Sequence, residues 1–309
     1  TITRYRMTEP ARKVSIVIPA YNYAQVLPRA LESVISQREL HHEIIVIDDG
    51  STDETSDVLA ALSQQYPGAF KVVRKENGGL ASVRNRGITE AAAPWLIFLD
   101  ADDELAPGAL EAIDAHLESH PDTEMIIGGH IAVEADGRRR EHKPGVLSDD
   151  AVARVRAYLL DKRLTLANGA CVMHKNVFSR GTYPERFRNA EDIPVFVQVL
   201  ANHHCSVLPK PILIIHKHDD SLRHQFHYAK ATGSNLVDEV FSPSRLDERF
   251  AKLKREYAVQ RNLSLFRTAY LAGEVDEAKA FFKTALAADW KVLFRFSYSR
   301  KAAKLLFHS

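Results

Sequence analysis

The chain has 309 residues, of which 45% are hydrophobic, enough to bury a large core as one domain with an appendage or as two modest domains. Its 41 Lys and Arg residues nearly balance 40 Asp and Glu residues. The resulting formal net charge of +1 excludes a general attraction for nucleic acid, which is therefore not an expected partner. Two cysteines, Cys171 and Cys205, are too few for a disulfide framework, so we expect buried thiols and a cytoplasmic location.

Hydrophobic residues are not gathered into a membrane-crossing segment. No stretch approaches the roughly 20 apolar residues that span a bilayer, so a spanning helix is not expected. Residues 1–12 are polar and are not followed by an apolar run of signal-peptide length, so we expect a polar N-terminal tail there.

Short apolar runs rich in β-branched residues alternate with helical patterns in the first third of the chain. Strands are expected at 14–19, 42–47, 70–73 and 95–99, and helices at 26–37, 54–66 and 80–92. This alternation predicts a largely parallel sheet with helices on both faces.

The second half mixes helices and strands. Helices are expected at 106–119, 148–160 and 192–201, and strands at 124–133, 171–173 and 212–216, with a hairpin turn at Asp136-Gly137. Beyond residue 242 the pattern is helical throughout. Its expected helices are 245–262, 263–271, 275–287 and 290–307. The predicted fold is therefore α/β with an all-helical C-terminal appendage.

Acidic residues gather where two expected strands end. Asp48 and Asp49 follow the second strand, and Asp100, Asp102 and Asp103 follow the fourth. In open α/β sheets ligands bind outside the carboxyl ends of the strands, so these acids converge on one site. Convergent carboxylates repel each other unless a cation neutralises them, and oxygen ligands of this kind suit Mg²⁺ or Mn²⁺ carrying phosphate oxygens.

Four motifs follow one another in fixed order within residues 13–105. They are Pro19-Ala20-Tyr21-Asn22, the turn Asp48 to Asp53, Asn77-Gly78-Gly79 with Arg84-Asn85-x-Gly87, and Asp100-Ala101-Asp102. In this order they resemble glycosyltransferase family 2. The resemblance implies a GT-A fold, a Rossmann-like and mainly parallel central sheet flanked by helices. It also implies inverting transfer of a sugar from a nucleotide diphosphate donor. Residues 13–105 would bind the donor, 106–241 the acceptor, and 242–309 would form the helical region.

The resemblance also implies particular donor contacts. Tyr21 would stack on uracil, Asp49 would accept a hydrogen bond from the base N3, and Arg84 would approach the donor phosphates or sugar. Further contacts implied by the motifs are Pro19, Asn22, Asn77, Gly79 and Ala101. The residues alone leave other interpretations open: a strand-end aromatic for Tyr21, a helix-capping cluster around Asp49, and a surface arginine for Arg84.

A metal site is implied at the Asp-x-Asp motif. Asp102 would bind Mn²⁺ or Mg²⁺ directly, and Asp100 would meet the ribose or bind the metal through water. The segment His216 to Ser221 resembles the late His-x-x-Ser segment of the family, in which His218 would complete the metal shell. An acidic surface loop and a structural histidine are the alternatives.

A Glu-Asp pair in the second half matches the position of the family's general base. By resemblance, Asp192 would take the proton of the acceptor, and Glu191 would orient it or touch the acceptor or metal. Alternatively, both acids simply favour the N-terminal dipole of the helix that they precede.

Two basic features remain. Arg138 to Arg140 follow the hairpin turn. They are expected to form a solvated loop, and the alternative is that they contact an anionic acceptor. The last helix, from Trp290, mixes aromatic with basic residues, which suits peripheral contact with the cytoplasmic face of an inner membrane. Packing on the catalytic domain is the alternative, because Phe294 and Phe296 do not share a face of one helix.

Three classes of protein compete for this pattern. A dinucleotide-dependent oxidoreductase requires a Gly-x-Gly-x-x-Gly turn after the first strand, and residues 19–24 contain no glycine. A non-catalytic nucleotide-sugar-binding or scaffold protein predicts damaged acids, whereas Asp102, Glu191 and Asp192 are all present. We therefore expect a UDP-sugar-dependent transferase acting on a glycan or glycolipid hydroxyl in bacterial surface polysaccharide or lipopolysaccharide synthesis.

Overall fold

The computed structural model describes residues 13–39, 41–217 and 222–307. The strands are β1 Val14–Ala20, β2 His42–Asp48, β3 Lys71–Arg74, β4 Trp95–Phe98, β5 Glu104–Leu105, β6 Met125–Val133, β7 Arg139–His142, β8 Cys171–His174 and β9 Cys205–His216. The α-helices are α1 Leu27–Ile35, α2 Thr55–Gln65, α3 Leu80–Glu90, α4 Ala109–Ser119, α5 Ala151–Leu159, α6 Ile193–Asn202, α7 Leu222–Thr232, α8 Asn235–Val240, α9 Ala251–Ala272, α10 Val275–Ala288 and α11 Phe296–Phe307.

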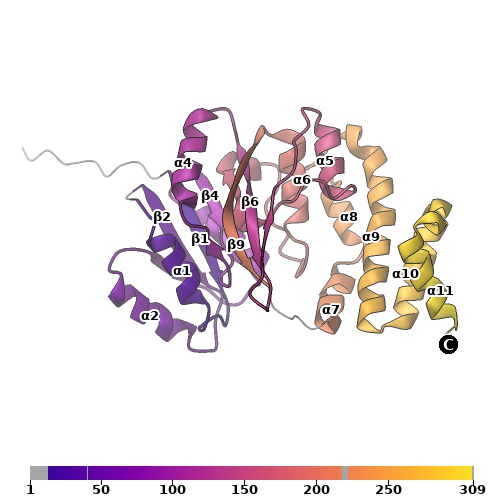
Figure 1. The fold of residues 1–309 in the computed structure, drawn as a ribbon, viewed down its shortest axis with the longest axis horizontal. Coiled ribbons are helices and arrows are strands. Elements are labelled where there is room, and N and C mark those ends of the chain that lie inside the picture. Colours follow the sequence, from indigo (N-terminus) through magenta and orange to yellow (C-terminus); the bar gives the residue numbers. More distant parts are fainter. Residues whose placement is uncertain (1–12, 40, 218–221, 308–309) are drawn as a thin grey trace, which may run out of the picture.

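In the described residues the strands form one sheet in the order β3-β2-β1-β4-β8-β6-β9-β5, with β7 paired to β6 (Figure 1). Strands β1 to β4 are parallel to one another, as the sequence predicts. Strand β8 runs antiparallel to both β4 and β6, and β9 is parallel to β6. Five strands, β1, β2, β4, β6 and β9, therefore run in the same direction, and their carboxyl ends lie at one edge of the sheet. Ligands bind at this edge in such folds.

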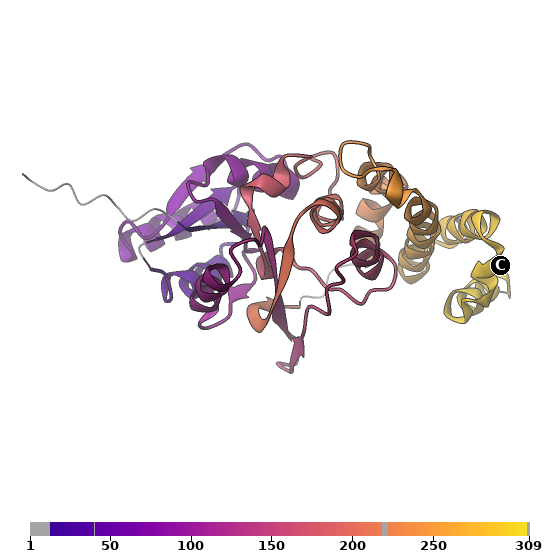
Figure 2. The same ribbon diagram turned by 90° about the horizontal axis from the view of Figure 1, so that it is seen from above.

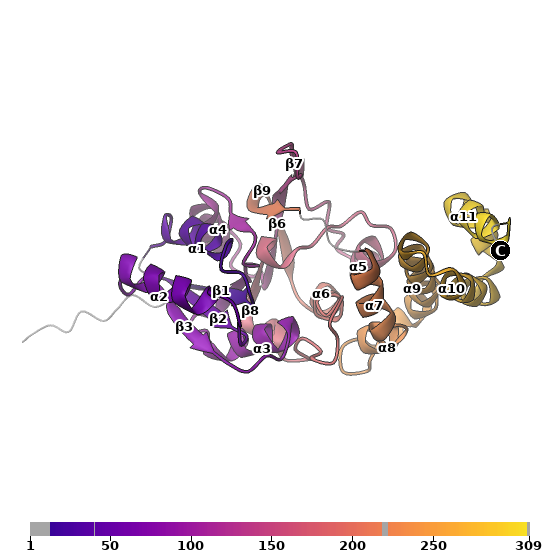
Figure 3. The same ribbon diagram turned by 90° about the horizontal axis from the view of Figure 1, so that it is seen from below.

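Helices cover both faces of the sheet. In β1, Val17 belongs to a core that includes side chains of α3, α5 and α6, whereas Ile16 and Ile18 belong to a second core with side chains of α1, α2 and α4. Figure 3 shows α1 and α4 on one side of the strands and α3 on the other. This double burial explains why the parallel strands are continuous apolar runs rather than alternating ones.

Strand β9 is longer than its sequence predicts. It begins at Cys205 rather than at residue 212, and its register against β6 shifts on both sides of Gly129. Pro209 and Pro211 are typical strand breakers, but prolines are tolerated where a bulge interrupts the ladder. The two-residue strand β5 and the helices α7 and α8 also lie outside the predicted elements.

The C-terminal helices stack at the far end of the long axis, away from β1 to β3 (Figures 1 and 2). Two predictions in this region were wrong. Helix α9 is continuous through residues 262 and 263 and ends at Ala272, and the next residue, Gly273, has a φ of +80° that suits a glycine C-cap. The segment expected as one helix from Trp290 is instead a 3₁₀-helix, Trp290–Phe294, followed by α11.

Within the described residues, no helix combines the length and the hydropathy that a membrane-spanning segment requires.

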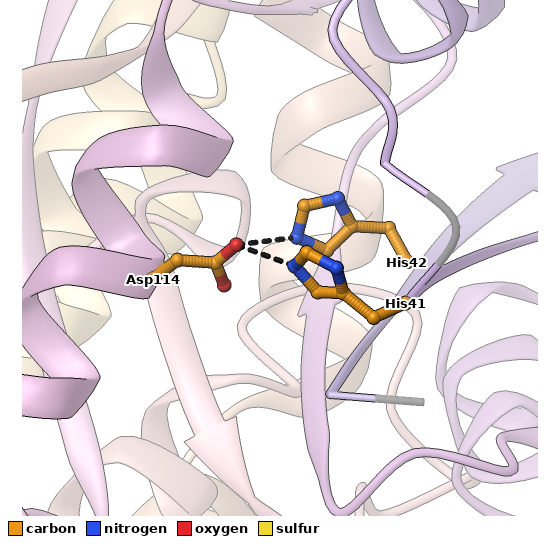
Figure 4. Close-up of side chains that lie close together, drawn as sticks. All are labelled: His41, His42 and Asp114. Atoms are coloured by element: carbon orange, nitrogen blue, oxygen red, sulfur yellow. Dashed lines mark hydrogen bonds and ion pairs between the residues drawn. The ribbon is translucent and has the colours of Figure 1, made fainter. Parts of the chain in front are cut away.

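At the opposite edge of the sheet, His41, just before β2, and His42, its first residue, contact one carboxylate of α4 (Figure 4). His41 Nε2 and His42 Nε2 lie 2.7 and 3.0 Å from Asp114 Oδ2. The Nδ1 atom of His42 accepts a hydrogen bond from the Glu39 amide at 3.2 Å, which assigns the proton of a neutral ring to Nε2. The same nitrogen would have to lose that proton to bind a metal, so we interpret the cluster as hydrogen bonds that join β2 to α4.

Candidate active site

A pocket of about 440 Å³ opens where β1, β2 and β4 end. Eight of the expected donor residues line it, namely Pro19, Tyr21, Asp49, Asn77, Gly79, Asp100, Ala101 and Asp102. Its remaining lining residues are Ala20, Tyr23, Leu80, Val83, Arg188 and Tyr228. Residues that are far apart in the sequence thus meet because parallel strands deliver their ends to one edge of the sheet.

The carboxylate of Asp49 is buried and holds the loop before α3. Its Oδ1 accepts hydrogen bonds from Lys75 Nζ at 2.5 Å and from the Gly78 amide at 3.0 Å, and its Oδ2 accepts one from the Gly79 amide at 2.8 Å. Asn77 Nδ2 donates to the Asp49 carbonyl oxygen at 3.0 Å. The side chain therefore does not cap α2, and this alternative for Asp49 is excluded.

Asn22 has a structural role that its motif does not indicate. Its backbone is in the left-handed region, with φ of +56°, and its Oδ1 accepts hydrogen bonds from the amides of Thr52 at 2.8 Å and Asp53 at 3.3 Å. Asn22 does not line the 440 Å³ pocket. Its side chain instead holds the turn after β2 against the turn after β1.

The Asp-x-Asp loop carries concentrated negative charge. The side chain of Asp100 is 41% exposed and that of Asp102 is half-buried, whereas Asp103 is buried. Burial, helped by the charges of Asp100 and Asp102, raises the pKa of Asp103 to about 7, although the hydrogen bond from the His216 amide lowers it. Arg29 lies beside this loop, because its Nη2 donates to the Asp102 carbonyl oxygen at 2.6 Å. Its positive charge offsets part of the negative charge and lowers the pKa of Asp103.

Arg84 connects this loop to the second half of the chain. The side chain is only 2% exposed, which contradicts the surface alternative, and it does not line the pocket. Its Nη1 donates to Glu191 Oε1 at 2.6 Å and its Nη2 to Asp100 Oδ1 at 3.2 Å. The guanidinium also lies over the ring of Tyr183, 5.4 Å from its centroid. Arg84 therefore positions two carboxylates from outside the pocket.

The rest of the Arg84 motif fixes the helix that carries this residue. Asn85 Nδ2 donates to the Tyr183 carbonyl oxygen at 2.9 Å, and the Tyr183 amide donates back to Asn85 Oδ1 at 3.0 Å. A Cβ atom at Gly87 would lie 2.7 Å from Val17 Cγ1 and 3.1 Å from Phe98 Cε1. Only glycine lets α3 approach β1 and β4 this closely.

Glu191 and Asp192 lie at the start of α6. Asp192 is the N-cap residue, but its side chain makes no capping hydrogen bond, so capping does not explain its presence. Burial raises the pKa of Asp192 to about 6, and the neighbouring Glu191 charge adds to this effect while Arg84 opposes it. Ala190, just before the pair, has φ of +59°, a sharp turn in the backbone at this point. A carboxylate with a raised pKa is suited to accept a proton near neutral pH.

His218, the expected additional metal ligand, lies outside the described residues. The strand that leads to it is fixed to the acidic loop. The His216 amide donates to Asp103 Oδ1 at 3.0 Å, and His216 Nε2 lies 2.6 Å from Glu104 Oε1. The described end of β9 therefore lies beside the Asp-x-Asp motif.

Arg188 and Tyr228 line the pocket, but the sequence motifs do not predict them. A Cβ atom at position 79 would lie 1.8 Å from Arg188 Nη1, so glycine there makes room for this guanidinium beside the start of α3. Arg188 lies three positions before Glu191, and a basic residue so close to the acidic pair could have indicated a site residue. The spacing of the motifs offers no such signal for Tyr228, which lies on the unpredicted helix α7.

The sheet topology and the pocket at its edge define a GT-A-like fold. The same fold occurs in the crystal structure of Staphylococcus aureus TarS residues 1–349 in complex with UDP-GlcNAc, with a TM-score of 0.63, 20% sequence identity, and coverage of 89% of this chain and 81% of that chain. The family model of glycosyl transferase family 2 matches residues 15–186. The chain belongs to this family, which confirms the resemblance found in its motifs.

Two relatives show how far sequence similarity extends. An uncharacterized glycosyltransferase of Nostoc is 41% identical over 101 residues, which are 33% of this chain and 31% of that protein. The minor teichoic acid biosynthesis protein GgaB of Bacillus subtilis is 32% identical over 130 residues, which are 41% of this chain and 14% of that protein. The chain spans about a third of the length of the first curated relatives it matches.

Arg84→Gln is predicted to lower the free energy of unfolding by about 3–5 kcal/mol, because Glu191 and Asp100 would lose a buried cationic partner. The measurement is equilibrium unfolding in denaturant at neutral pH. Arg86→Gln is the matched control on the same helix, since Arg86 is 45% exposed and pairs with Glu90 at 2.7 Å. We expect the control to lose less than about 1 kcal/mol. Equal losses in the two variants would contradict the bridging role of Arg84.

Proposed function

We propose that this chain is an inverting, metal-dependent glycosyltransferase that moves a sugar from a UDP-sugar to an acceptor hydroxyl. The observation that carries the proposal is the convergence of Asp49, Asp100 and Asp102 on one pocket, which Arg84 ties to Glu191 beside Asp192. Family membership supports the reaction class. UDP-GlcNAc in the complex of TarS supports a UDP-sugar as the donor.

The walls of the pocket suit a uridine. Tyr21 lines it with 44% of its surface exposed, which leaves ring area available for stacking on a base. Asp49 accepts three hydrogen bonds, and a carboxylate offers about four lone-pair sites. The remaining site can accept a hydrogen bond from the N3–H of uracil, a donor that neutral cytosine lacks.

The chemistry of the acidic loop fits a divalent cation. Asp100 and Asp102 supply the hard oxygen ligands that Mg²⁺ and Mn²⁺ prefer, and Arg84, which also pairs with Glu191, offsets only part of their negative charge. Asp102 would hold the ion, with Asp100 beside it and His218 as a further candidate. A bound ion would stabilise negative charge on the departing diphosphate.

The proposed reaction is a single displacement. Asp192 takes the proton of the acceptor hydroxyl, the acceptor oxygen forms a bond to the anomeric carbon, and the bond from that carbon to the diphosphate breaks on the opposite face. UDP leaves with the electron pair of that bond. Glu191, fixed by Arg84, orients Asp192 or the acceptor.

We place the donor on residues 13–105 and the acceptor on residues 106–241, with residues 242–309 as a helical region. The name of GgaB refers to teichoic acid biosynthesis, which favours an acceptor in a cell-surface glycan or glycolipid. Bacterial surface polysaccharide or lipopolysaccharide synthesis at the cytoplasmic face of the inner membrane fits this proposal. A non-catalytic nucleotide-sugar-binding or scaffold protein would bind UDP-sugar without turnover.

Calorimetric titration is predicted to detect UDP binding in Mn²⁺ and much weaker binding in EDTA, with GDP and ADP weaker than UDP in both. Asp102→Ala is predicted to remove the difference between Mn²⁺ and EDTA while leaving the thermal unfolding curve unchanged. Asp136→Ala, in an exposed turn at the end of β6, is the control and should behave as the unsubstituted chain. A full metal response in Asp102→Ala would refute the ligand assignment.

Asp192→Asn is predicted to lower kcat by about 10²–10⁴-fold, because the side chain can no longer accept a proton, while UDP affinity stays unchanged. Turnover of the unsubstituted chain should fall as pH drops through about 6, where Asp192 becomes protonated. Stability should respond in the opposite sense. Folding raises the pKa of Asp192 from 3.8 to about 6, so its contribution to stability is fully present below the lower value and is lost as the pH rises to the higher one, and the variant should be at least as stable at pH 7.

A purely structural role for Asp192 makes a different prediction. Asp192→Asn would then unfold at a lower denaturant concentration, and the acidic limb of the pH profile would persist in its residual activity. Turnover close to that of the unsubstituted chain would remove Asp192 from the role of base.

A further inference from the structure

Large apolar side chains are exposed close together near the C-terminal end of the described chain. Trp290, Leu293, Phe294 and Phe296 are exposed by 62%, 49%, 62% and 81%. The rings of Trp290 and Phe294 contact each other edge to face, with centroids 5.5 Å apart. Clustered exposure of this kind marks a contact surface, whereas single exposed apolar residues are ordinary.

The break in the last helix explains how this surface forms. The 3₁₀-helix ends at Phe294, Arg295 has φ of −83° and ψ of +77°, and α11 begins at Phe296. Phe294 and Phe296 are therefore not successive positions of one helix. They need not share a helical face in order to share a surface.

Other side chains already satisfy the packing of these helices. Val292 is buried with Val259, Leu263 and Ala285, and Tyr298, Ala302 and Leu305 pack against a core around Phe266. The exposed aromatics are additional to this packing. The alternative that the last segment uses its apolar residues only to pack on the rest of the chain is thus wrong for these four.

Basic residues lie close to the exposed aromatics in the sequence. Residues 290–309 contain Lys291, Arg295, Arg300, Lys301 and Lys304 and no Asp or Glu, in a chain whose net charge is only +1. Lys291 and Arg300 are exposed and Lys301 is half-buried. Among the described residues, none of these three has a carboxylate within ion-pairing distance. Their charge is therefore available to an anionic partner.

We propose that Trp290, Leu293, Phe294 and Phe296, with Lys291, Arg300 and Lys301, form a docking surface for an anionic lipid bilayer, here called the aromatic-basic surface. Aromatic rings insert at the level of the lipid headgroups, and basic side chains gain from the negative surface potential of the bilayer. A second copy of the chain is a poorer occupant, because two such surfaces would face each other with the same positive charge. This proposal stands apart from the assignment of the donor and the base.

Co-sedimentation of the full chain with vesicles tests the proposal. We expect binding to vesicles of phosphatidylcholine with phosphatidylglycerol, and little binding to phosphatidylcholine alone. Arg300→Gln/Lys301→Gln should weaken binding to the anionic vesicles by roughly 30-fold. Phe294→Ser/Phe296→Ser should weaken it by about tenfold or more, since inserted apolar area is lost.

Val146→Ser is the matched control, because Val146 is 89% exposed in a loop after β7 and should not affect vesicle binding. Thermal unfolding and UDP titration of every variant should match the unsubstituted chain, which separates loss of docking from loss of folding. Equal binding to neutral and anionic vesicles would overturn the proposal. So would variants that bind as tightly as the unsubstituted chain, or light scattering in which Phe294→Ser/Phe296→Ser only converts a dimer to a monomer.

Discussion

The buried guanidinium of Arg84 is the interaction on which the rest of the site depends. It binds Asp100, which follows β4, and Glu191, which precedes α6, so one side chain joins the acidic loop of the pocket to the acidic pair of the second half. Without this cation the buried Glu191 carboxylate would lose its charged partner, which costs several kcal/mol. Because Glu191 is adjacent to Asp192, the same contact fixes where the proposed base can lie.

The acids at the edge of the sheet have separate tasks despite their similar positions. Asp49 is buried and organises the loop from Asn77 to Gly79 through hydrogen bonds. Asp103 is buried, and its Oδ1 accepts a hydrogen bond from the His216 amide. This hydrogen bond joins β9 to the Asp-x-Asp loop. Asp100 and Asp102 line the pocket, where negative charge is useful only when a cation balances it. Burial and hydrogen bonding, rather than residue type, therefore distinguish Asp103 from Asp100 and Asp102.

Much of this organisation could be predicted from the sequence because its signals are local. Strands β1 and β2 are continuous apolar runs, and the acids that follow them had to meet at one edge once the strands were parallel. Contacts between segments that are far apart in the chain have no comparable local signal in the sequence. The partners of Arg84 lie 16 and 107 residues away, and the spacing within its motif indicates neither. The start of β9 was missed because a bulge accommodates Pro209 and Pro211, and the break at Arg295 follows from packing rather than from a helix-breaking residue.

The central claim is that Asp192 supports a single displacement, and the anomeric configuration of the released sugar tests it most directly. Slow hydrolysis of an α-linked UDP-sugar that the chain accepts, with water as the acceptor, can be followed by proton NMR before the released sugar mutarotates. Inversion at the α-linked anomeric carbon predicts that the β anomer of the sugar appears first. If the α anomer appeared first, the sugar would have been transferred with retention, and the proposed role of Asp192 as the base of an inverting transfer would be contradicted.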